Sequence, residues 1–278
     1  MDNLIVVRGG GDLATGTIYK LTQCGFPVLI LETAHPSAIR RQVAFSEAVY
    51  EGKQCVEGIT CYRAENIEQA LSWLEQGKLS LLINENGDCL FDCKPLAVVD
   101  AILAKKNLGT HRDMAPITVA LGPGFTAGVD VDAVIETKRG HQLGRVLYQG
   151  TAAPNTGVPG VIAGVSKERV IHASATGILH NVSSIGDAVE KGQEIAWVET
   201  EMGERVSVNA TISGLLRGLI RDAYPVTVGF KIADIDPRLS EYENCFTISD
   251  KARCIAGGVI EAILHLKQQK EEKLYDLR

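Results

Sequence analysis

The first 32 residues contain the pattern that most restricts the fold: an apolar run, a glycine-rich turn, a helical segment, a second apolar run and an acidic residue. The apolar runs at 4–7 and 28–31 have the length of buried strands, and the string GGGDLATG occupies 9–16 between the first run and the helix. This order of elements predicts a βαβ unit and an α/β, Rossmann-like N-terminal domain.

The glycine turn predicts a cofactor site at the start of the helix. Glycines spaced as G-x-G-x-x-A allow a tight turn and let a phosphate approach the helix N-terminus, where free amides and the helix dipole favour an anion. Glu32 follows the second apolar run, where an acid accepts hydrogen bonds from the ribose of a dinucleotide. The alternative is that the glycines only permit the strand-to-helix turn. The cofactor-binding residues expected here are Gly9, Gly10, Gly11, Asp12, Ala14, Thr15 and Glu32.

The rest of the first half continues the α/β pattern. The expected elements are helices at 67–73 and 95–105 and strands at 79–83, 117–121, 129–136 and 143–148. A glycine-rich loop at 122–128 follows one of these strands. Because open α/β sheets bind ligands at the carboxyl ends of their strands, Gly122 and Gly124 are expected to line the same site. A plain tight connection is the alternative.

The second half contains an internal repeat of 37 residues, counted from Gly177 to Gly214. One unit alone would expose strand edges and half of its apolar face, so the two copies are expected to interlock. The duplication resembles the barrel-sandwich fold of biotinyl and lipoyl carrier domains, in which a lysine on the hairpin between the halves carries the prosthetic group. The corresponding hairpin, 199–205, has no lysine. The expected all-β barrel therefore closes over the site or mediates assembly.

The segment 136–145 concentrates positive charge at the end of an expected strand. Arginine offers a two-pronged fork for a phosphate or carboxylate, so Arg139 and His141 are added to the expected cofactor-binding residues. The alternative is a solvated turn between strands.

Cys93 is the candidate catalytic residue. It precedes Pro95, a residue favoured in the first turn of a helix, and helix N-termini and neighbouring cations such as Lys94 lower the pKa of a thiol. A buried packing cysteine is the alternative.

Composition excludes several classes of function. The net charge of −6 without a basic block argues against nucleic acid as a partner, and no apolar run is long enough for a membrane helix. Seven cysteines without CxxC pairs indicate reduced thiols and a cytoplasmic location. The histidines show no metal-ligand spacing, so no metal site is expected.

Several long strings resemble one known family. They include GGGDLATG (9–16), RRQVAFSEAVYEG (40–52), CKPLAVVDAILAKKNLGT (93–110), LGPGFTAG (121–128), ETKRGHQLGRV (136–146), NTGVPG (155–160) and SDKARCIAGGVIEAI (249–263). On these strings the chain resembles the YqeB-type accessory family of selenium-dependent molybdenum hydroxylase systems, which is similar in purpose to the xanthine dehydrogenase accessory proteins. The resemblance implies a maturation role and a molybdenum hydroxylase subunit as partner.

Together these patterns predict three parts: a Rossmann-like domain at 1–160, a barrel-sandwich domain at 165–240 and a C-terminal helix at 249–278 that packs back on the first domain. The expected function is that of an accessory protein that binds or handles the molybdenum cofactor. An NAD(P)-dependent oxidoreductase and a non-catalytic scaffold that docks the hydroxylase through the barrel are the alternatives. The expected cofactor is accordingly the molybdenum cofactor or a dinucleotide, and a homo-oligomer is compatible with either. The sequence leaves open whether the chain catalyses a reaction.

Overall fold

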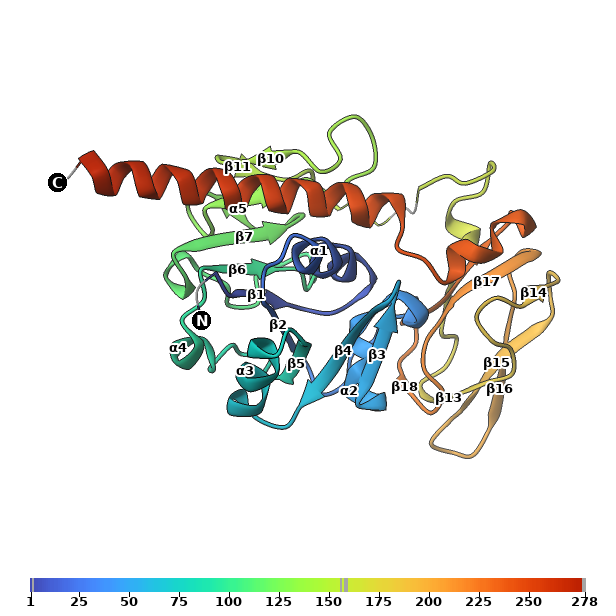
Figure 1. Ribbon diagram of the computed structural model, residues 1–278. Helices are drawn as coiled ribbons and strands as arrows, with labels where there is room; N and C mark the ends of the chain where they lie inside the picture. Colours follow the sequence, from blue (N-terminus) through green and yellow to red (C-terminus); the bar gives the residue numbers. More distant parts are fainter. Residues whose placement is uncertain (2, 156, 158–159, 277–278) are drawn as a thin grey trace. The chain divides into compact units, whose positions relative to one another are not determined.

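The computed structural model describes residues 1, 3–155, 157 and 160–276 of the chain, and the elements are labelled in Figure 1. Half of the NTGVPG string, positions 156, 158 and 159, therefore lies outside the described residues. The chain divides into two compact units. Unit 1 comprises 1–36, 44–155 and 248–278, and unit 2 comprises 37–43 and 156–247. The short segment 37–43 thus belongs with the second unit although it is surrounded in sequence by the first.

Unit 1 is built on a nine-stranded mixed sheet with the order β10-β9-β7-β6-β1-β2-β5-β4-β3. Its strands are β1 (Ile5–Arg8), β2 (Val28–Glu32), β3 (Lys53–Val56), β4 (Ile59–Ala64), β5 (Leu79–Ile83), β6 (Ala97–Asp100), β7 (Ile117–Leu121), β9 (Ala133–Ile135) and β10 (Val146–Leu147). The strands from β9 to β4 are parallel to their neighbours, whereas β10 and β3 pair antiparallel at the two edges. A small separate sheet pairs β8 (Thr126–Ala127) with β11 (Gly150–Thr151).

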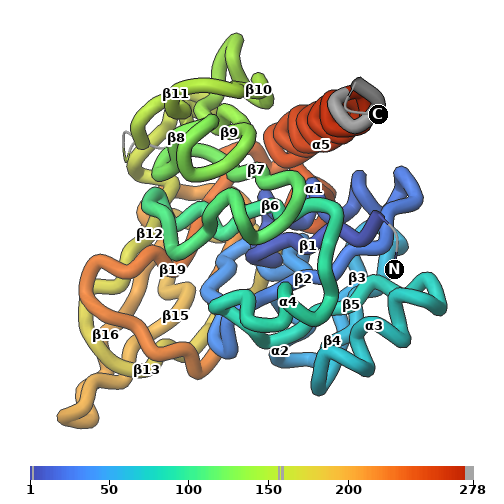
Figure 2. Tube along the Cα trace, turned by 90° about the vertical axis from the view of Figure 1, so that its left-hand side faces the viewer, coloured from blue at the N-terminus to red at the C-terminus, as the bar shows by residue number. Residues whose placement is uncertain are grey.

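Helices cover both faces of this sheet. The helices of unit 1 are α1 (Asp12–Gln23), α2 (Ala48–Glu51), α3 (Ile67–Glu75), α4 (Leu90–Cys93) and α5 (Asp250–Asp276). Unit 1 also has 3-10 turns at Phe45–Glu47 and Arg112–Met114, and the 3-10 turn at Arg41–Val43 belongs to unit 2. Val6 of β1, Leu29 and Leu31 of β2, and Leu4 directly before β1 share one core with α3 and α4. The side-by-side helices α1 and α5 lie along the other face (Figures 1 and 2).

The Rossmann-like prediction for this half is wrong in its overall form. The βαβ unit of β1, α1 and β2 is present, but the connections from β6 to β7 and from β7 to β9 contain no α-helix, and both sheet edges are antiparallel. The helix expected at 95–105 is instead the central strand β6 followed by irregular chain. Ala97 to Asp100 pair with β1 on one side and β7 on the other, and this pairing overrides the helical propensity of the segment.

Unit 2 contains two four-stranded sheets with the orders β12-β19-β17-β14 and β16-β15-β13-β18. Its strands are β12 (Val170–His172), β13 (Gly177–Asn181), β14 (Ala188–Val189), β15 (Glu194–Glu199), β16 (Arg205–Asn209), β17 (Gly214–Leu219), β18 (Pro225–Val226) and β19 (Lys231–Asp236), with 3-10 turns at Lys167–Arg169 and Leu239–Cys245. The repeat counted in the sequence appears as equivalent strands: β13, β14 and β15 of the first copy correspond to β17, β18 and β19 of the second. Each copy gives its short middle strand to the sheet of the other, because β14 pairs with β17 and β18 pairs with β13.

The expected barrel is nevertheless wrong. In the described part of unit 2 the two sheets are separate and share one buried core, and they do not close on themselves. Gly177 and Gly214 occupy equivalent positions where a Cβ would collide with the carbonyl oxygens of Glu199 and Asp236. The repeat therefore specifies close strand approaches within each sheet, and a closed barrel does not follow from it.

Close packing of α5 leads to a stability prediction at two adjacent glycines. A Cβ at Gly258 would overlap the carbonyl oxygen of Gly144 and lie 3.1 Å from Ile135 Cγ2, whereas a Cβ at Gly257 would meet nothing within 4 Å. Forcing a methyl group into this contact should destabilise the protein by about 1–3 kcal/mol. That cost is larger than the ~0.5–1 kcal/mol by which alanine stabilises a helix relative to glycine. Urea denaturation of Gly258→Ala should thus give a lower free energy of unfolding by about 1–2 kcal/mol.

The matched control is Gly257→Ala, which should raise the free energy of unfolding by about 0.5–1 kcal/mol. If both substitutions stabilised the protein equally, the close contact between α5 and Gly144 would be refuted.

Candidate functional site

The carboxyl ends of the parallel strands in unit 1 bring most of the expected site residues to one edge of the sheet. β1, β2 and β6 end at Arg8, Glu32 and Asp100. The chain order reverses between β1 and β6, since β1 leads through α1 to β2 on one side while β6 lies on the other. Open α/β sheets bind ligands at the carboxyl edge beside such a reversal.

The first two glycines of the turn are closed by the protein itself. Gly9 has a φ of +96° and packs against the backbone of Ile102, where a Cβ would lie 3.0 Å away. A Cβ on Gly10 would lie 3.0 Å from the amide nitrogen of Ser46, and that amide donates to the Gly10 carbonyl oxygen at 2.9 Å. Gly10, which lies between the two glycines of the G-x-G spacing, thus admits a segment of the same chain.

Glu32 turns toward the glycine turn and binds it directly. Its carboxylate accepts hydrogen bonds from the Gly10 amide at 2.7 Å and from the Thr33 amide at 2.8 Å. Burial raises the pKa of Glu32, and the two amide hydrogen bonds partly oppose that shift. The carboxylate expected to hold a ribose is therefore occupied by the backbone of the turn.

The third glycine is different, because the space beside it is open. Gly11 is the N-cap of α1 and has no side chain to cap the helix, and a Cβ built there would meet nothing within 4 Å. Asp12 is the first residue of α1. Ala14 and Thr15 are buried, and the Thr15 hydroxyl donates to the Gly10 carbonyl and accepts from the Phe45 amide at 3.0 Å. Ala14 and Thr15 support the turn, and Gly11 and Asp12 present its exposed end.

The start of α5 adds positive charge beside this end of α1. A Cβ on Gly16 of α1 would lie 2.7 Å from Ala252 Cβ, so the first turns of the two helices are in contact. Lys251 is half-buried, and its pKa is lowered mainly by this burial and secondly by the nearby Arg139. The carboxylates of Asp12, Glu136 and Asp250 partly oppose this shift. In the described part of the chain its ammonium has neither a hydrogen bond nor an ion pair.

Two of the neighbouring carboxylates are already engaged. Asp250 accepts both guanidinium nitrogens of Arg139 at 2.9 Å. Glu136 is buried and accepts from the amides of Lys138 at 2.7 Å and Ala153 at 2.8 Å. Lys251 is thus the cation at this edge whose donors are directed to no acceptor within the described residues.

The other expected residues have different positions. Gly122 and Gly124 pack closely against Thr137 and against the backbone of Lys106, and their role in binding stays a prediction. His141 is exposed in the loop after β9. Cys93 ends the one-turn helix α4, and no helix starts after it, so the helix N-terminus expected to activate its thiol is absent from this described segment.

A buried polar network at the same edge was not anticipated from the sequence. Arg8 donates to the Thr110 hydroxyl, which in turn donates to Asp100, and all three side chains are almost fully buried. Arg8 Nη2 also donates to the carbonyl oxygens of Glu85 at 2.7 Å and Leu108 at 3.3 Å. Burial raises the pKa of Asp100 despite Thr110, the Ile102 amide and Arg8. The only sequence signal was a charged residue ending each of two apolar strands.

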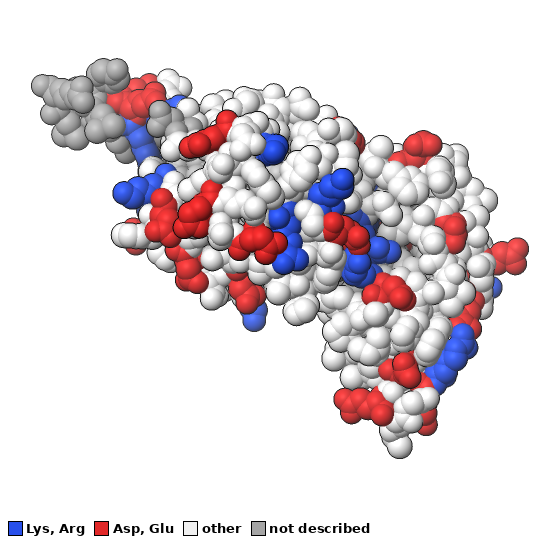
Figure 3. Space-filling view, turned by 60° about the horizontal axis from the view of Figure 1, so that its bottom comes forward, with Lys and Arg blue, Asp and Glu red and all other residues white. Residues whose placement is uncertain are grey.

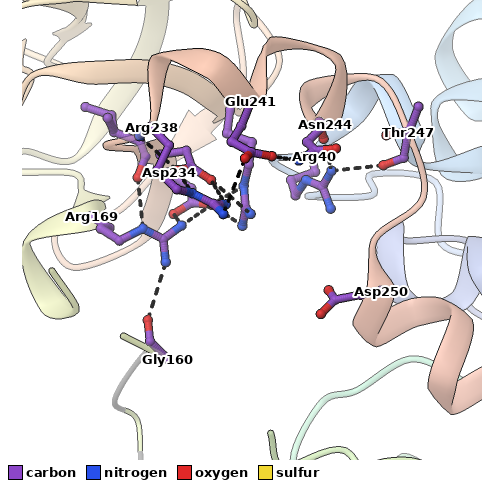
Figure 4. Close-up of polar contacts among 12 residues, drawn as sticks. Arg40, Gly160, Arg169, Asp234, Arg238, Glu241, Asn244, Thr247 and Asp250 are labelled. Atoms are coloured by element: carbon purple, nitrogen blue, oxygen red, sulfur yellow. Dashed lines mark hydrogen bonds and ion pairs between the residues drawn. The ribbon is translucent and has the colours of Figure 1, made fainter. Parts of the chain in front are cut away.

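Unit 2 contains a second buried charge cluster, shown in Figure 4. Arg169 and Asp234 are both more than nine-tenths buried and form an ion pair at 3.0 Å, and Arg217 reaches the same carboxylate at 2.6 Å. Arg238 binds the buried Asp236 at 2.8 Å. Arg40, in the segment 37–43, donates to the carbonyl oxygens of Asn244 and Thr247. These contacts connect the strands and loops of unit 2 through charges that neutralise one another.

The surface charges, the possible metal ligands and the helix hydropathy can be compared with the expected partners, metals and location. On the face in Figure 3, Lys and Arg side chains are interspersed with Asp and Glu. Among the residues that the structure describes, no group of three or more His, Cys, Asp or Glu side chains is placed to hold a metal ion. No described helix is long and apolar enough to cross a membrane. The expected partner subunit, homo-oligomer and cytoplasmic location stay predictions.

Comparison with known proteins identifies a relative over nearly the whole chain. Over 266 residues, 96% of its length, the chain is 49% identical to the uncharacterized protein YqeB of Escherichia coli (strain K12). Over this region the chain is therefore similar to YqeB at close to half of its positions. It spans about half of YqeB, 48% of that protein's length. No family model matches the chain.

The solved structures that resemble this chain do so with low TM-scores. They include the product-bound ectoine utilization protein EutE (DoeB) from Ruegeria pomeroyi, with 12% identity, 83% of this chain and 56% of that chain covered, and a TM-score of 0.25. An aspartoacylase family protein from Mesorhizobium loti has 12% identity, 86% of each chain covered and a TM-score of 0.29. A succinylglutamate desuccinylase from Silicibacter has 12% identity, 84% of each chain covered and a TM-score of 0.27. Similarity at this level transfers neither fold nor activity.

The expected functions are corrected at this point. Glu32 and Ser46 cover the turn at Gly10, and the backbone holds the Glu32 carboxylate, so the contact expected to hold a ribose is not available. The geometry of the turn supports neither the maturation role nor the NAD(P)-dependent oxidoreductase, and the expected cofactor stays a prediction. The scaffold alternative required a barrel, and unit 2 has two open sheets in its described residues.

The buried pair in unit 2 leads to a second stability prediction. Asp234→Asn removes the negative charge that Arg169 and Arg217 share inside the protein, and an uncompensated buried charge costs about 3–5 kcal/mol. Urea denaturation should show a loss of that size in the free energy of unfolding. Glu194→Gln is the control, because its partner Arg205 is half-exposed and such pairs contribute about 0–1 kcal/mol. A loss below about 1 kcal/mol in Asp234→Asn would show that the cluster is not electrostatically coupled.

Proposed function

We propose that unit 1 binds a small anionic molecule, through a phosphate or a comparable oxyanion, at the N-termini of α1 and α5. The observation that carries the proposal is Lys251, a half-buried lysine beside the uncapped start of α1 with no hydrogen bond or ion pair in the described part of the chain. The free amides of a first helical turn and the positive end of the helix dipole favour an anion.

The surroundings favour one anionic group over an extended dinucleotide. Gly11 leaves open space at the start of α1, whereas Gly9 and Gly10 are covered by the chain itself. Arg139 lies near enough to Lys251 to lower its pKa, so a bound anion relieves repulsion between two cations. Asp250 already pairs with Arg139, and Glu136 is held by two amides.

Buried polar atoms at the same edge also lack partners. Arg8 and Ser46 are more than nine-tenths buried, and within the described residues neither Arg8 Nε nor Ser46 Oγ has a hydrogen bond. Unsatisfied buried donors are rare in folded proteins and are commonly satisfied by a water or a ligand. The backbone of Ser46 lies against Gly10, and Arg8 ends β1 directly before the glycine turn.

Titration calorimetry with inorganic pyrophosphate tests the proposal on the full chain. Lys251→Met should weaken binding at least about tenfold, which corresponds to ~1.4 kcal/mol. Lys251→Arg should retain binding because it keeps the charge, and Lys267→Met is the control on the same helix, since Lys267 instead hydrogen-bonds Asn3 at 3.0 Å. No binding by the wild-type protein, or equal binding by Lys251→Met, would refute the site.

The lowered pKa of Lys251 predicts a pH dependence of binding. The protonated ammonium attracts an anion, so affinity is full below the folded-state pKa and declines as the pH rises through it, at a lower pH than for an ordinary lysine of pKa about 10.4. Sulfate is the suitable probe because it does not titrate in this range. Lys251→Arg should abolish the decline, since arginine stays charged. A wild-type profile that matches Lys251→Arg would remove Lys251 from the site.

A further inference from the structure

Two cysteines in the β5–β6 connection are not used by the proposed anion site. Cys89 and Cys93 are both buried, at 5% and 6% exposure, and they are four residues apart across the single turn of α4. The Cys93 amide donates to the Cys89 carbonyl oxygen at 3.1 Å, which is the hydrogen bond of one helical turn. A turn of this kind places two residues about 6 Å apart along the helix axis.

The two thiols lie one helical turn apart in the same buried core cluster. Cys93 Sγ lies 3.8 Å from the carbonyl oxygen of Leu90. Interaction with the neighbouring Cys89 thiol lowers the pKa of Cys93, and the same interaction together with burial raises the pKa of Cys89. One sulfur is therefore prepared to be the thiolate and the other holds the shared proton.

We infer that Cys89 and Cys93 form a reversible dithiol–disulfide pair that exchanges with low-molecular-weight disulfides. Disulfides join cysteines whose Cα atoms are about 4.4–6.8 Å apart, and one helical turn meets this requirement. Their Cβ atoms must approach to about 3.5–4.5 Å, closer than the roughly 5–6 Å of an intact turn, so the bond forms as α4 opens. The inference is independent of the anion site, because none of the residues proposed to hold the anion takes part in it.

Access to the sulfurs requires only the local opening of α4. The helix has four residues, too few for a stable isolated helix, and it ends at Lys94, a non-glycine residue with a φ of +41°. A left-handed conformation costs such a residue free energy, so the folded form of this turn is strained at its end. Phe91 is 83% exposed, and the outer side of the turn is thus not buried by the rest of unit 1.

The exchange proceeds in two steps that balance. The Cys93 thiolate attacks one sulfur of the disulfide, a bond between Cys93 Sγ and that sulfur forms, and the original S–S bond breaks to release one thiolate, which takes up a proton. Cys89 then gives its proton to solvent and attacks Cys93 Sγ, so that the protein disulfide forms and the second thiolate leaves. The protein loses two hydrogens and is oxidised, while the small disulfide is reduced to two thiols.

Mass spectrometry of the full-length protein in glutathione redox buffers tests the inference. Trypsin does not cleave between Lys94 and Pro95, so Cys89 and Cys93 remain together in the peptide 79–105, which contains no other cysteine. As the ratio of oxidised to reduced glutathione rises, this peptide should lose two hydrogens after alkylation of free thiols. Reduction with excess thiol should restore both alkylation sites.

Single substitutions separate the roles of the two sulfurs. Cys89→Ser should stop at a glutathione adduct on Cys93, whereas Cys93→Ser should be modified much more slowly, because Cys89 remains buried and burial still raises its pKa. Cys61 is the internal control: it is fully buried and burial raises its pKa, so it should stay reduced throughout. A wild-type peptide that stays reduced, or gains only glutathione, would overturn the inference without any need for a variant that folds.

Discussion

One hydrogen bond, from the Gly10 amide to the Glu32 carboxylate, decides what the glycine turn can do. It joins the turn after β1 to the end of β2 and places a buried carboxyl against the first half of the glycine turn. The charge is costly there, because burial raises the pKa of Glu32, and two backbone amides reduce that cost. The same bond leaves Gly11 and the start of α1 open, so the recognition surface moves from the turn to the helix end.

The βαβ unit could be predicted from the sequence because its signals are local. The apolar runs at 4–7 and 28–31 and the glycines between them each restrict the backbone within a few residues, and β1, α1 and β2 appear there. The 37-residue repeat is equally local, and its strands recur at equivalent positions in the two copies. Sheet closure is not local: whether two interlocked copies form a barrel depends on pairing at the sheet edges, and these edges remain separate.

The site could be predicted only where it follows a strand directly. Arg139 and Asp12 belong to strings found near strand ends, but Lys251 is far from both in sequence and reaches the edge because α5 packs on α1 through Gly16 and Ala252. Arg8, Thr110 and Asp100 likewise come together through the pairing of β1 with β6. A single sequence contains no register between distant segments, so charged groups that meet through tertiary packing cannot be grouped in advance.

The misplaced helix at 95–105 shows how one such error affects chemistry. Its residues favour a helix, and with a helix starting at Pro95 the Cys93 thiol would lie at a helix N-terminus and be acidified by the helix dipole. The sheet requires a strand between β1 and β7, and Ala97–Asp100 supplies it, so Cys93 instead ends the short helix α4. Its pKa is still lowered, but the cause is the interaction with the Cys89 thiol. The change of cause changes the chemistry, because a thiol acidified by a second thiol has a partner with which it can form a disulfide.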